Sequence, residues 1–217
     1  MKSVAESKNG ILLDLGCGAN KQGENWVGLD RRKLQGVDHV HDLEVFPYPI
    51  ESDSCLTIVA SHVAEHIRPT SIDARIIGLF NLLVQKGIIT AEEIFRFCGE
   101  VNDEPVFIRF MNECWRMLKD GGRFAIGVPY GRSDGMLQDP THINFINEAT
   151  WQYFSPEHGL FYIYRPLPWK IIQNTWMQTG NMEVLLEKVT TFKDLMTNTT
   201  IEGVTFKKHY QLQEGTV

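Results

Sequence analysis

The sequence lacks any apolar run long enough to cross a membrane, and its first residues, MKSVAESKNG, lack the apolar core of a signal peptide. Cysteines are few and scattered, and none forms a CxxC pair; they are Cys17, Cys55, Cys98 and Cys114. Scattered cysteines of this kind are typical of reduced thiols. We therefore expect a cytoplasmic protein without a membrane segment.

Positive charge is also scarce. The 21 lysines and arginines are outnumbered by 27 aspartates and glutamates, which leaves a formal net charge of −6 at pH 7 and an isoelectric point near 5.6. This balance argues against a general nucleic-acid binder, although it does not exclude a nucleic-acid substrate. The hydrophobic content of 43% and charged content of 22% are ordinary for a globular protein, and 217 residues suit one domain.

Short apolar runs that end in turn residues predict strands. They lie at residues 10–15, 26–30, 39–42, 55–60 and 123–129, and a closing hairpin is expected from 171–177 and 182–189 with its turn at 179–181. Strands that alternate with turns or helices and end in a hairpin predict an α/β fold. We expect a Rossmann-like, mostly parallel sheet with a carboxy-terminal antiparallel hairpin, in a three-layer sandwich.

The helical pattern is concentrated between the fourth and fifth predicted strands. Apolar residues recur at helical spacing from Ile72 to Leu83, Gly87 ends that pattern, and Thr90 and Glu93 form a capping-box pattern. A further helix is expected at 110–118. We predict one domain over 1–217 with a helical insertion at about 70–109, which would serve as a lid, a recognition element, a dimer surface or simple decoration. The tail from about residue 191 has no predicted place.

Ligands on such sheets bind beyond the carboxyl ends of the strands. The first strand ends in Asp14-Leu15-Gly16-Cys17-Gly18, whose glycines allow close approach of the backbone to a ligand, and the second ends in Asp30, a carboxylate suited to ribose hydroxyls. The third ends in Asp42-Leu43, suited to an adenine amino group and ring. The third glycine of a dinucleotide fingerprint is replaced by Lys21, and residues 19–25 leave little room for a helix. These features favour an adenosine ligand without phosphates.

Four stretches in order, LLDLGCGANK, VGLD, VHDLEVFPYPIESDSCLTIVASHVAEHI and MNECWRMLKDGGRFAIGVP, resemble successive motifs of the class I S-adenosylmethionine-dependent methyltransferases. The resemblance covers about residues 10–155 and is greatest to the broad "type 11" group. It implies methyl transfer from S-adenosylmethionine, with a small-molecule acceptor favoured and a homodimer left open. The shortened link after the first strand leaves a second hypothesis, a binding protein of the same fold that has lost catalysis.

The resemblance also implies a role for each strand-end residue. Asp14, Gly16 and Gly18 would contact the methionine and ribose parts of the cofactor. Asp30 would bind the ribose hydroxyls. The adenine would lie near Arg31, Asp42 and Leu43. Ser61 and His62 would face the transferable methyl group. Lys21 would pair with the carboxylate of the cofactor, a hypothesis based on charge matching.

The segment SHVAEH contains His62, Glu65 and His66 in the order H-x-x-E-H, a zinc-hydrolase signature. Such enzymes need both histidines on one uninterrupted helix and a third ligand, for which Glu148 is a candidate. Here the pattern directly follows a predicted buried strand, and Pro69 leaves room only for a very short helix. We therefore expect no metal. The resemblance implies that Glu65 and His66 order the turn or shape the substrate site, and a zinc-dependent hydrolase is kept as the less favoured alternative.

Candidate catalytic residues follow the fifth predicted strand. Asp139 is placed to orient the imidazole of His142 as a general base, with His62 the third candidate. An equally weighted interpretation is that His142 only hydrogen-bonds a loop carbonyl. The resemblance implies that a loop with His142, Phe145, Trp151 and Phe154 covers the acceptor, although aromatic residues are more often part of the core.

Overall fold

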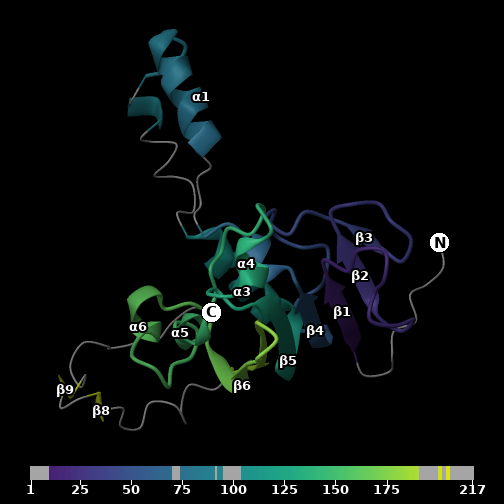
Figure 1. Ribbon diagram of the computed structural model, residues 1–217. Coiled ribbons are helices and arrows are strands. Elements are labelled where there is room, and N and C mark those ends of the chain that lie inside the picture. Colours follow the sequence, from purple (N-terminus) through teal and green to yellow (C-terminus); the bar gives the residue numbers. More distant parts are fainter. Residues whose placement is uncertain are drawn as a thin grey trace.

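The protein is described from a computed structural model, which covers residues 10–69, 74–90, 92–94, 104–190, 200–201 and 204–205. Seven strands form one sheet in the order β3-β2-β1-β4-β5-β7-β6 (Figure 1). The strands are β1 (Ile11–Leu15), β2 (Val27–Asp30), β3 (His39–Val40), β4 (Cys55–Ser61), β5 (Leu118–Pro129), β6 (Trp169–Trp176) and β7 (Asn181–Lys188). Strands β1 to β5 pair in parallel, whereas β7 pairs antiparallel with both β5 and β6. The predicted mostly parallel sheet with a carboxy-terminal hairpin is confirmed.

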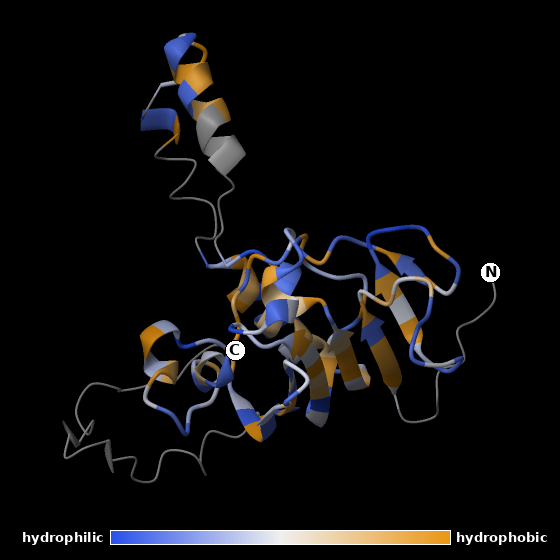
Figure 2. Ribbon diagram, viewed as in Figure 1, coloured by the Kyte–Doolittle hydropathy of each residue, from blue (hydrophilic) through white to orange (hydrophobic). Residues whose placement is uncertain are grey.

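The central strands are buried because their sequences are almost continuously apolar. Leu13 of β1 pairs with Val27 of β2 on one side and with Ile58 of β4 on the other, and Leu13 and Ile58 have no exposed surface. Figure 2 shows hydrophobic residues in orange along these strands. Such runs are typical of parallel strands that are covered by protein on both faces.

The main core lies between the sheet and two helices, α3 (Val106–Met117) and α5 (Glu148–Gln152). The ring of Phe110 in α3 lies 6.0 Å from the ring of Phe124 in β5, and Trp151 of α5 donates a hydrogen bond to the sulfur of Met182 in β7. The sheet and the helices on this face account for two of the three predicted layers.

The boundaries of α3 and β5 differ from those expected. The helix begins at Val106 instead of residue 110, because Pro105 precedes it with extended ψ. Strand β5 begins at Leu118 instead of residue 123. Gly121 adopts a φ of +68° inside the strand, where the register with β4 shifts, so residues 119–122 form an irregularity within β5 instead of a break between helix and strand.

The segment predicted as an insertion contains α1 (Ala74–Gln85), which lies away from the sheet in Figure 1. After it, the capping box is confirmed, because the N–H of Glu93 donates to Thr90 Oγ1 at 3.1 Å and the N–H of Thr90 donates to the Glu93 carboxylate at 2.8 Å. Ile72 and Cys98 lie outside the described residues. Within the described residues, no helix combines the length and apolar character needed to cross a membrane.

The remaining elements are short. They are η1 (Ala64–His66), α4 (Asp134–Leu137), α6 (Phe161–Tyr164), β8 (Thr200–Ile201) and β9 (Val204–Thr205). Strands β8 and β9 pair with each other, and the rest of the predicted tail lies outside the described residues. Two of these elements, η1 and α4, follow β4 and β5 and shape one side of the site.

Candidate functional site

The turn after β1 depends on Gly16. Its φ is +65°, a region that favours glycine, and its N–H donates to the carbonyl of Leu29 at 2.7 Å. A Cβ added at Gly16 would lie 2.4 Å from a methyl carbon of Val63, so the position has no room for a side chain. Residues 16–26 form turns and bends without a helix, as the short link predicts.

Two of the predicted cofactor residues hold this turn in place. The buried carboxylate of Asp14 accepts a hydrogen bond from the N–H of Gln22 at 2.9 Å, and burial raises its pKa. The ammonium of Lys21 lies 2.9 Å from Asp38, which also accepts from the N–H of Gly28. Neither Asp14 nor Lys21 lines the cleft described below. Both residues lie outside the cleft lining and stabilise the adjacent turn through these contacts.

Asp30 ends β2 and is almost fully buried, with 5% of its surface exposed. Its carboxylate accepts from the N–H of Gly18 at 3.0 Å, from the N–H of Arg32 at 2.8 Å and from Arg32 Nε at 3.2 Å. Burial acts to raise the pKa of Asp30, but the hydrogen bonds from Arg32 and Gly18 outweigh it, so the pKa is lowered. Asp30 is therefore ionised at neutral pH. Arg32, which the sequence pattern did not single out, is its main partner.

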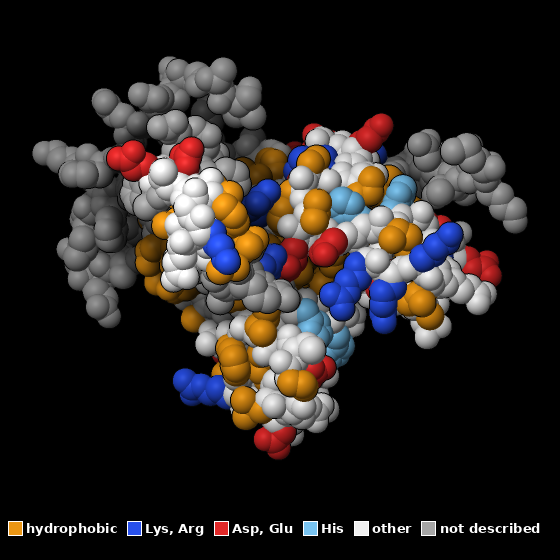
Figure 3. Space-filling view, turned by 90° about the horizontal axis from the view of Figure 1, so that it is seen from above, with side chains coloured by type: hydrophobic (Ala, Val, Ile, Leu, Met, Phe, Trp, Pro, Cys, Tyr) orange, Lys and Arg blue, Asp and Glu red, His pale blue; other side chains and the backbone are white. Residues whose placement is uncertain are grey.

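A cleft of about 600 Å³ opens at the carboxyl ends of β1, β2 and β4. Its lining combines acidic, basic, histidine and apolar side chains; it consists of Gly16, Asp30, Arg31, Arg32, Asp42, Leu43, Glu44, His62, Val63, His66, Ile67, Arg68, Thr141 and Ile143. Figure 3 views this side of the molecule, where pale blue histidines lie near basic and acidic side chains. Six predicted residues line the cleft, namely Gly16, Asp30, Arg31, Asp42, Leu43 and His62.

The rim that the sequence missed is held by long-range contacts. The guanidinium of Arg68 donates to the carboxylate of Glu44 at 2.8 Å, and the backbone N–H of Arg68 donates to the other oxygen at 3.0 Å. The hydroxyl of the buried Tyr48 donates to the carbonyl of Leu43 at 2.6 Å. These pairs are distant in sequence or lack a motif, so no local pattern marks them.

The chain makes a sharp turn where β4 ends. Ser61 is exposed, and His62 adopts a φ of +55°, an uncommon conformation for a non-glycine residue, with its N–H donating to the carbonyl of Gly127. The following 3-10 helix, η1, has only three residues. The very short helix predicted from Pro69 is confirmed, and the uninterrupted helix that a zinc hydrolase needs is not formed. Glu148 accepts a hydrogen bond from the hydroxyl of Tyr130, and among the described residues it does not belong to a group with these histidines that could hold a metal.

Glu65 lies at the centre of the predicted catalytic residues, with no exposed surface. Its Oε1 lies 3.3 Å from His62 Nδ1 and 4.0 Å from His142 Nε2. Its backbone carbonyl accepts hydrogen bonds from the N–H groups of Ile143 and Asn144. The loop after β5 is therefore fastened over η1, which brings His142 to Glu65.

The predicted pair of Asp139 and His142 is close but not hydrogen-bonded, since Asp139 Oδ2 lies 3.7 Å from His142 Nε2. Asp139 instead accepts from the hydroxyl and the N–H of Thr141, and these hydrogen bonds lower its pKa. The other ring nitrogen of His142 lies 3.1 Å from the carbonyl of Met136. Trp151 and Phe154 are buried in the core, whereas Phe145 is exposed.

Comparisons with known proteins show no family for this chain. No protein-family profile matches the sequence, and no curated protein matches it significantly. Among solved structures, the chain is similar to a SAM-dependent methyltransferase from Aquifex aeolicus, with 12% identity over 87% of each chain and a TM-score of 0.48. It is also similar to a putative type 11 methyltransferase from Sulfolobus solfataricus, with 14% identity over 85% of this chain and 87% of that one and a TM-score of 0.46.

A third similar structure is the [4+2]-cyclase SpnF, with 14% identity over 85% of this chain and 77% of that one and a TM-score of 0.46. Likenesses this distant carry no argument about activity, and one fold hosts different chemistries. The structure itself shows the fold implied by the resemblance to class I S-adenosylmethionine-dependent methyltransferases, a mostly parallel sheet that ends in an antiparallel hairpin, with a cleft at the carboxyl ends of its strands.

Proposed function

We propose that the protein binds S-adenosylmethionine in this cleft and transfers its methyl group to a small-molecule acceptor. The observation that carries the proposal is Asp30, a buried and ionised carboxylate that faces the same cleft as the Gly16 turn and Asp42-Leu43. The residues present fit such a ligand: Gly16 and Asp30 line the same cleft, and about 600 Å³ is within the range of small-molecule sites.

In this proposal, Asp30 binds the ribose hydroxyls. A carboxylate offers about four lone-pair sites, and the three hydrogen bonds from Gly18 and Arg32 leave capacity for a hydroxyl. The Arg32 side chain is 61% exposed, so a ligand can displace its Nε from Asp30 at small cost. Asp42 and Leu43 would then receive the adenine, with Leu43 held by Tyr48.

The cleft arginines are better placed than Lys21 to form an ion pair with the carboxylate of the ligand's methionine part. Lys21 is ion-paired with Asp38, which also fixes the backbone of β2 through Gly28. Arg31 and Arg32 line the cleft, and Arg32, although paired with Asp30, has a side chain that is 61% exposed. We therefore assign them this charge pairing in the proposal.

When bound, S-adenosylmethionine supplies a methyl group activated by a sulfonium. His62 lies in the cleft wall, and Ser61 and His62 stand where β4 ends, next to the space an acceptor would use. His142 is the candidate base, because donation of its Nδ1 proton to the carbonyl of Met136 leaves Nε2 free to accept a proton. Thr141 and Ile143 on either side of it line the cleft.

Calorimetry with S-adenosylhomocysteine tests the proposal. We expect micromolar binding by the unaltered protein and a loss of at least about 100-fold for Asp30→Ala, because two charge-assisted hydrogen bonds of about 1.5 kcal/mol or more each disappear. Asp134→Asn, an exposed acid in α4 outside the cleft lining, is the control and keeps full affinity. Absence of binding by the unaltered protein contradicts the proposal.

A second candidate function is binding of the same ligand without catalysis. It is favoured by the lack of a helix after the Gly16 turn, where the described chain forms only turns. Ligand binding without turnover on a panel of oxygen and nitrogen acceptors would support it. Methylation of any acceptor that is lost in His142→Gln would reject it in favour of the enzyme.

A further inference from the structure

Glu65 carries a buried carboxylate without a hydrogen-bond donor. Both of its oxygens are inaccessible to solvent, and neither receives a hydrogen bond from the described residues. A carboxylate taken out of water in this way is costly unless a positive charge compensates it. Ring nitrogens of His62 and His142 lie at ion-pair distance from its Oε1. The site therefore has a place for a cation.

His66 and His142 lie near Glu65, and in each of them one ring nitrogen lies near a backbone carbonyl. His142 Nδ1 lies 3.1 Å from the carbonyl of Met136, and His66 Nδ1 lies 3.3 Å from the carbonyl of Thr141. A ring nitrogen that donates to a carbonyl leaves the other nitrogen, Nε2, with a free lone pair. This arrangement is the usual support of metal-binding histidines, because it sets both the tautomer and the ring orientation.

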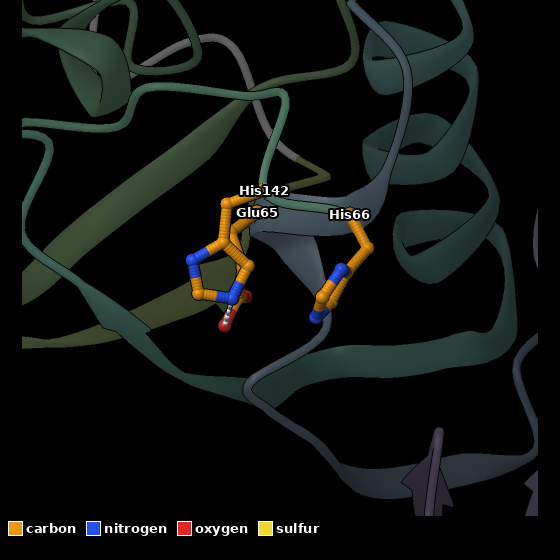
Figure 4. A group of neighbouring side chains, drawn as sticks. All are labelled: Glu65, His66 and His142. Carbon is orange, nitrogen blue, oxygen red and sulfur yellow. Dashed lines mark ion pairs between the residues drawn. The ribbon is translucent and has the colours of Figure 1, made fainter. Parts of the chain in front are cut away.

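We propose that Glu65, His66 and His142 bind one divalent transition-metal ion. One ligand atom from each lies within 4.8 Å of the other two (Figure 4). Two imidazoles and one carboxylate suit Zn²⁺ and its neighbours better than Mg²⁺ or Ca²⁺, which prefer oxygen ligands. Zinc–ligand distances of about 2.0–2.2 Å place ligand atoms roughly 3.5 Å apart, so binding would draw the three side chains inward.

This site differs from the zinc-hydrolase pattern. That pattern would pair His62 with His66 on one helix, whereas here the second imidazole comes from the loop after β5 and η1 is too short to present His62 and His66 together. His62 is 55% exposed beside Glu65 and is not part of this group of three. The expectation of no metal considered the hydrolase pattern alone.

The ion would lie at the edge of the cleft, since His66, Thr141 and Ile143 all line it. Three protein ligands leave coordination positions open, which is typical of catalytic metal sites. If the proposed function holds, on which this last step rests, an oxygen of the acceptor takes an open position beside the methyl group. The ion would then take the place of His142 as the group that activates this oxygen, since Nε2 of His142 binds the ion. The favoured acceptors are then molecules that carry a hydroxyl, carboxylate or phosphate oxygen.

The test uses the full chain after dialysis against EDTA. Zn²⁺ is titrated by calorimetry, and Co²⁺ is added separately because its visible absorption reports the number and kind of its ligands. We expect one equivalent of each ion to bind. Glu65→Gln, His66→Gln and His142→Gln should each weaken Zn²⁺ binding by at least about tenfold, the lower bound seen for loss of a supporting residue. Circular dichroism checks that each variant is folded.

His158→Gln is the matched control, because His158 lies in the loop between α5 and α6 outside the cluster, and it should bind Zn²⁺ unchanged. Absence of stoichiometric binding overturns the inference and leaves Glu65 paired with a charged imidazole. Equal binding by Glu65→Gln, His142→Gln and the unaltered protein overturns it as well. Binding of S-adenosylhomocysteine is measured on the same samples, so failure of the metal site and failure of the proposed function are told apart.

Discussion

The two sides of the cleft differ in how their acidic side chains are partnered. On the β1–β2 side, Asp14, Asp30 and Asp38 each accept at least one backbone N–H, and Asp30 and Asp38 also meet a basic side chain. On the β4–β5 side, the buried Glu65 receives no hydrogen bond from the described residues and faces only histidines. We call the β1–β2 side the complete side, because its acids have hydrogen-bond donors without a bound ligand. We call the β4–β5 side the incomplete side, because Glu65 has no such donor among the described residues.

This difference has an energetic meaning. A satisfied polar network rigidifies the backbone around it, whereas an unsatisfied buried charge destabilises the fold until a partner arrives. The β1–β2 side is therefore built to hold a ligand in a set geometry. On the β4–β5 side, binding of the proposed cation would supply a charge partner for Glu65.

The largest expected effect comes from disrupting the complete side. Gly16→Ala forces a Cβ to within 2.4 Å of Val63 at a φ of +65°, and we expect a loss of about 2–4 kcal/mol in the free energy of unfolding, measured by urea denaturation. Gly121→Ala is the matched control, since its φ is +68° but nothing lies within 4 Å, and it should lose only about 1 kcal/mol. Equal losses would mean that the contact with Val63 is unimportant.

A smaller effect is the opposite pH dependence that Asp30 and Asp14, two acids of the complete side, give to the free energy of unfolding. The lowered pKa of Asp30 contributes stability above the unfolded value of about 3.9, and this contribution is lost as the pH falls through the folded value. The raised pKa of Asp14 acts in the opposite sense, since its contribution is present below the unfolded value and is lost as the pH rises through the folded one.

The unfolding free energy therefore falls less on going from about pH 7 to about pH 3 in Asp30→Asn than in the unaltered protein, and it falls more in Asp14→Asn. At neutral pH, Asp30→Asn should also cost about 1–2 kcal/mol through its weakened hydrogen bonds. Urea denaturation at both pH values measures these changes. Identical slopes for the two variants would contradict the opposite environments assigned to the two acids.

The smallest expected effect, and the one of opposite sign, belongs to the incomplete side. In EDTA, Glu65→Gln removes a buried charge that has no donor, so the free energy of unfolding should rise by roughly 1 kcal/mol. Saturating Zn²⁺ should reverse the order, because only the unaltered protein gains stability from bound metal. A destabilised variant in EDTA would show instead that Glu65 is held by a charged histidine.

Much of the fold was predictable because it depends on local patterns. The apolar runs of β1, β2 and β4, the turn at Gly180 with a φ of +87° and the capping box at Thr90 all follow from neighbouring residues. The start of β5 was not predictable, since two glycines in Lys119-Asp120-Gly121-Gly122 favour a turn unless pairing with β4 holds the segment extended.

The residues of the candidate site can also be divided into those that local sequence predicts and those that it does not. Gly16, Asp30 and Asp42-Leu43 could be identified because each follows a recognisable strand, and parallel strands bring their carboxyl ends to one edge. Arg32 as the partner of Asp30 and the pairing of Glu44 with Arg68 could not, because they depend on side-chain directions that no short pattern encodes.

The sequence by itself determined the sheet, the glycine turn and the acids at the strand ends, all of which are properties of short segments. Only the tertiary structure decided what SHVAEH means. The parallel pairing of β4 with β5 and the hydrogen bonds from Ile143 and Asn144 to Glu65 bring the loop after β5 over η1, so Glu65 and His66 lie near the distant His142 as well as the local His62. Long-range contacts of this kind follow from chain topology, which spacing along the sequence does not express.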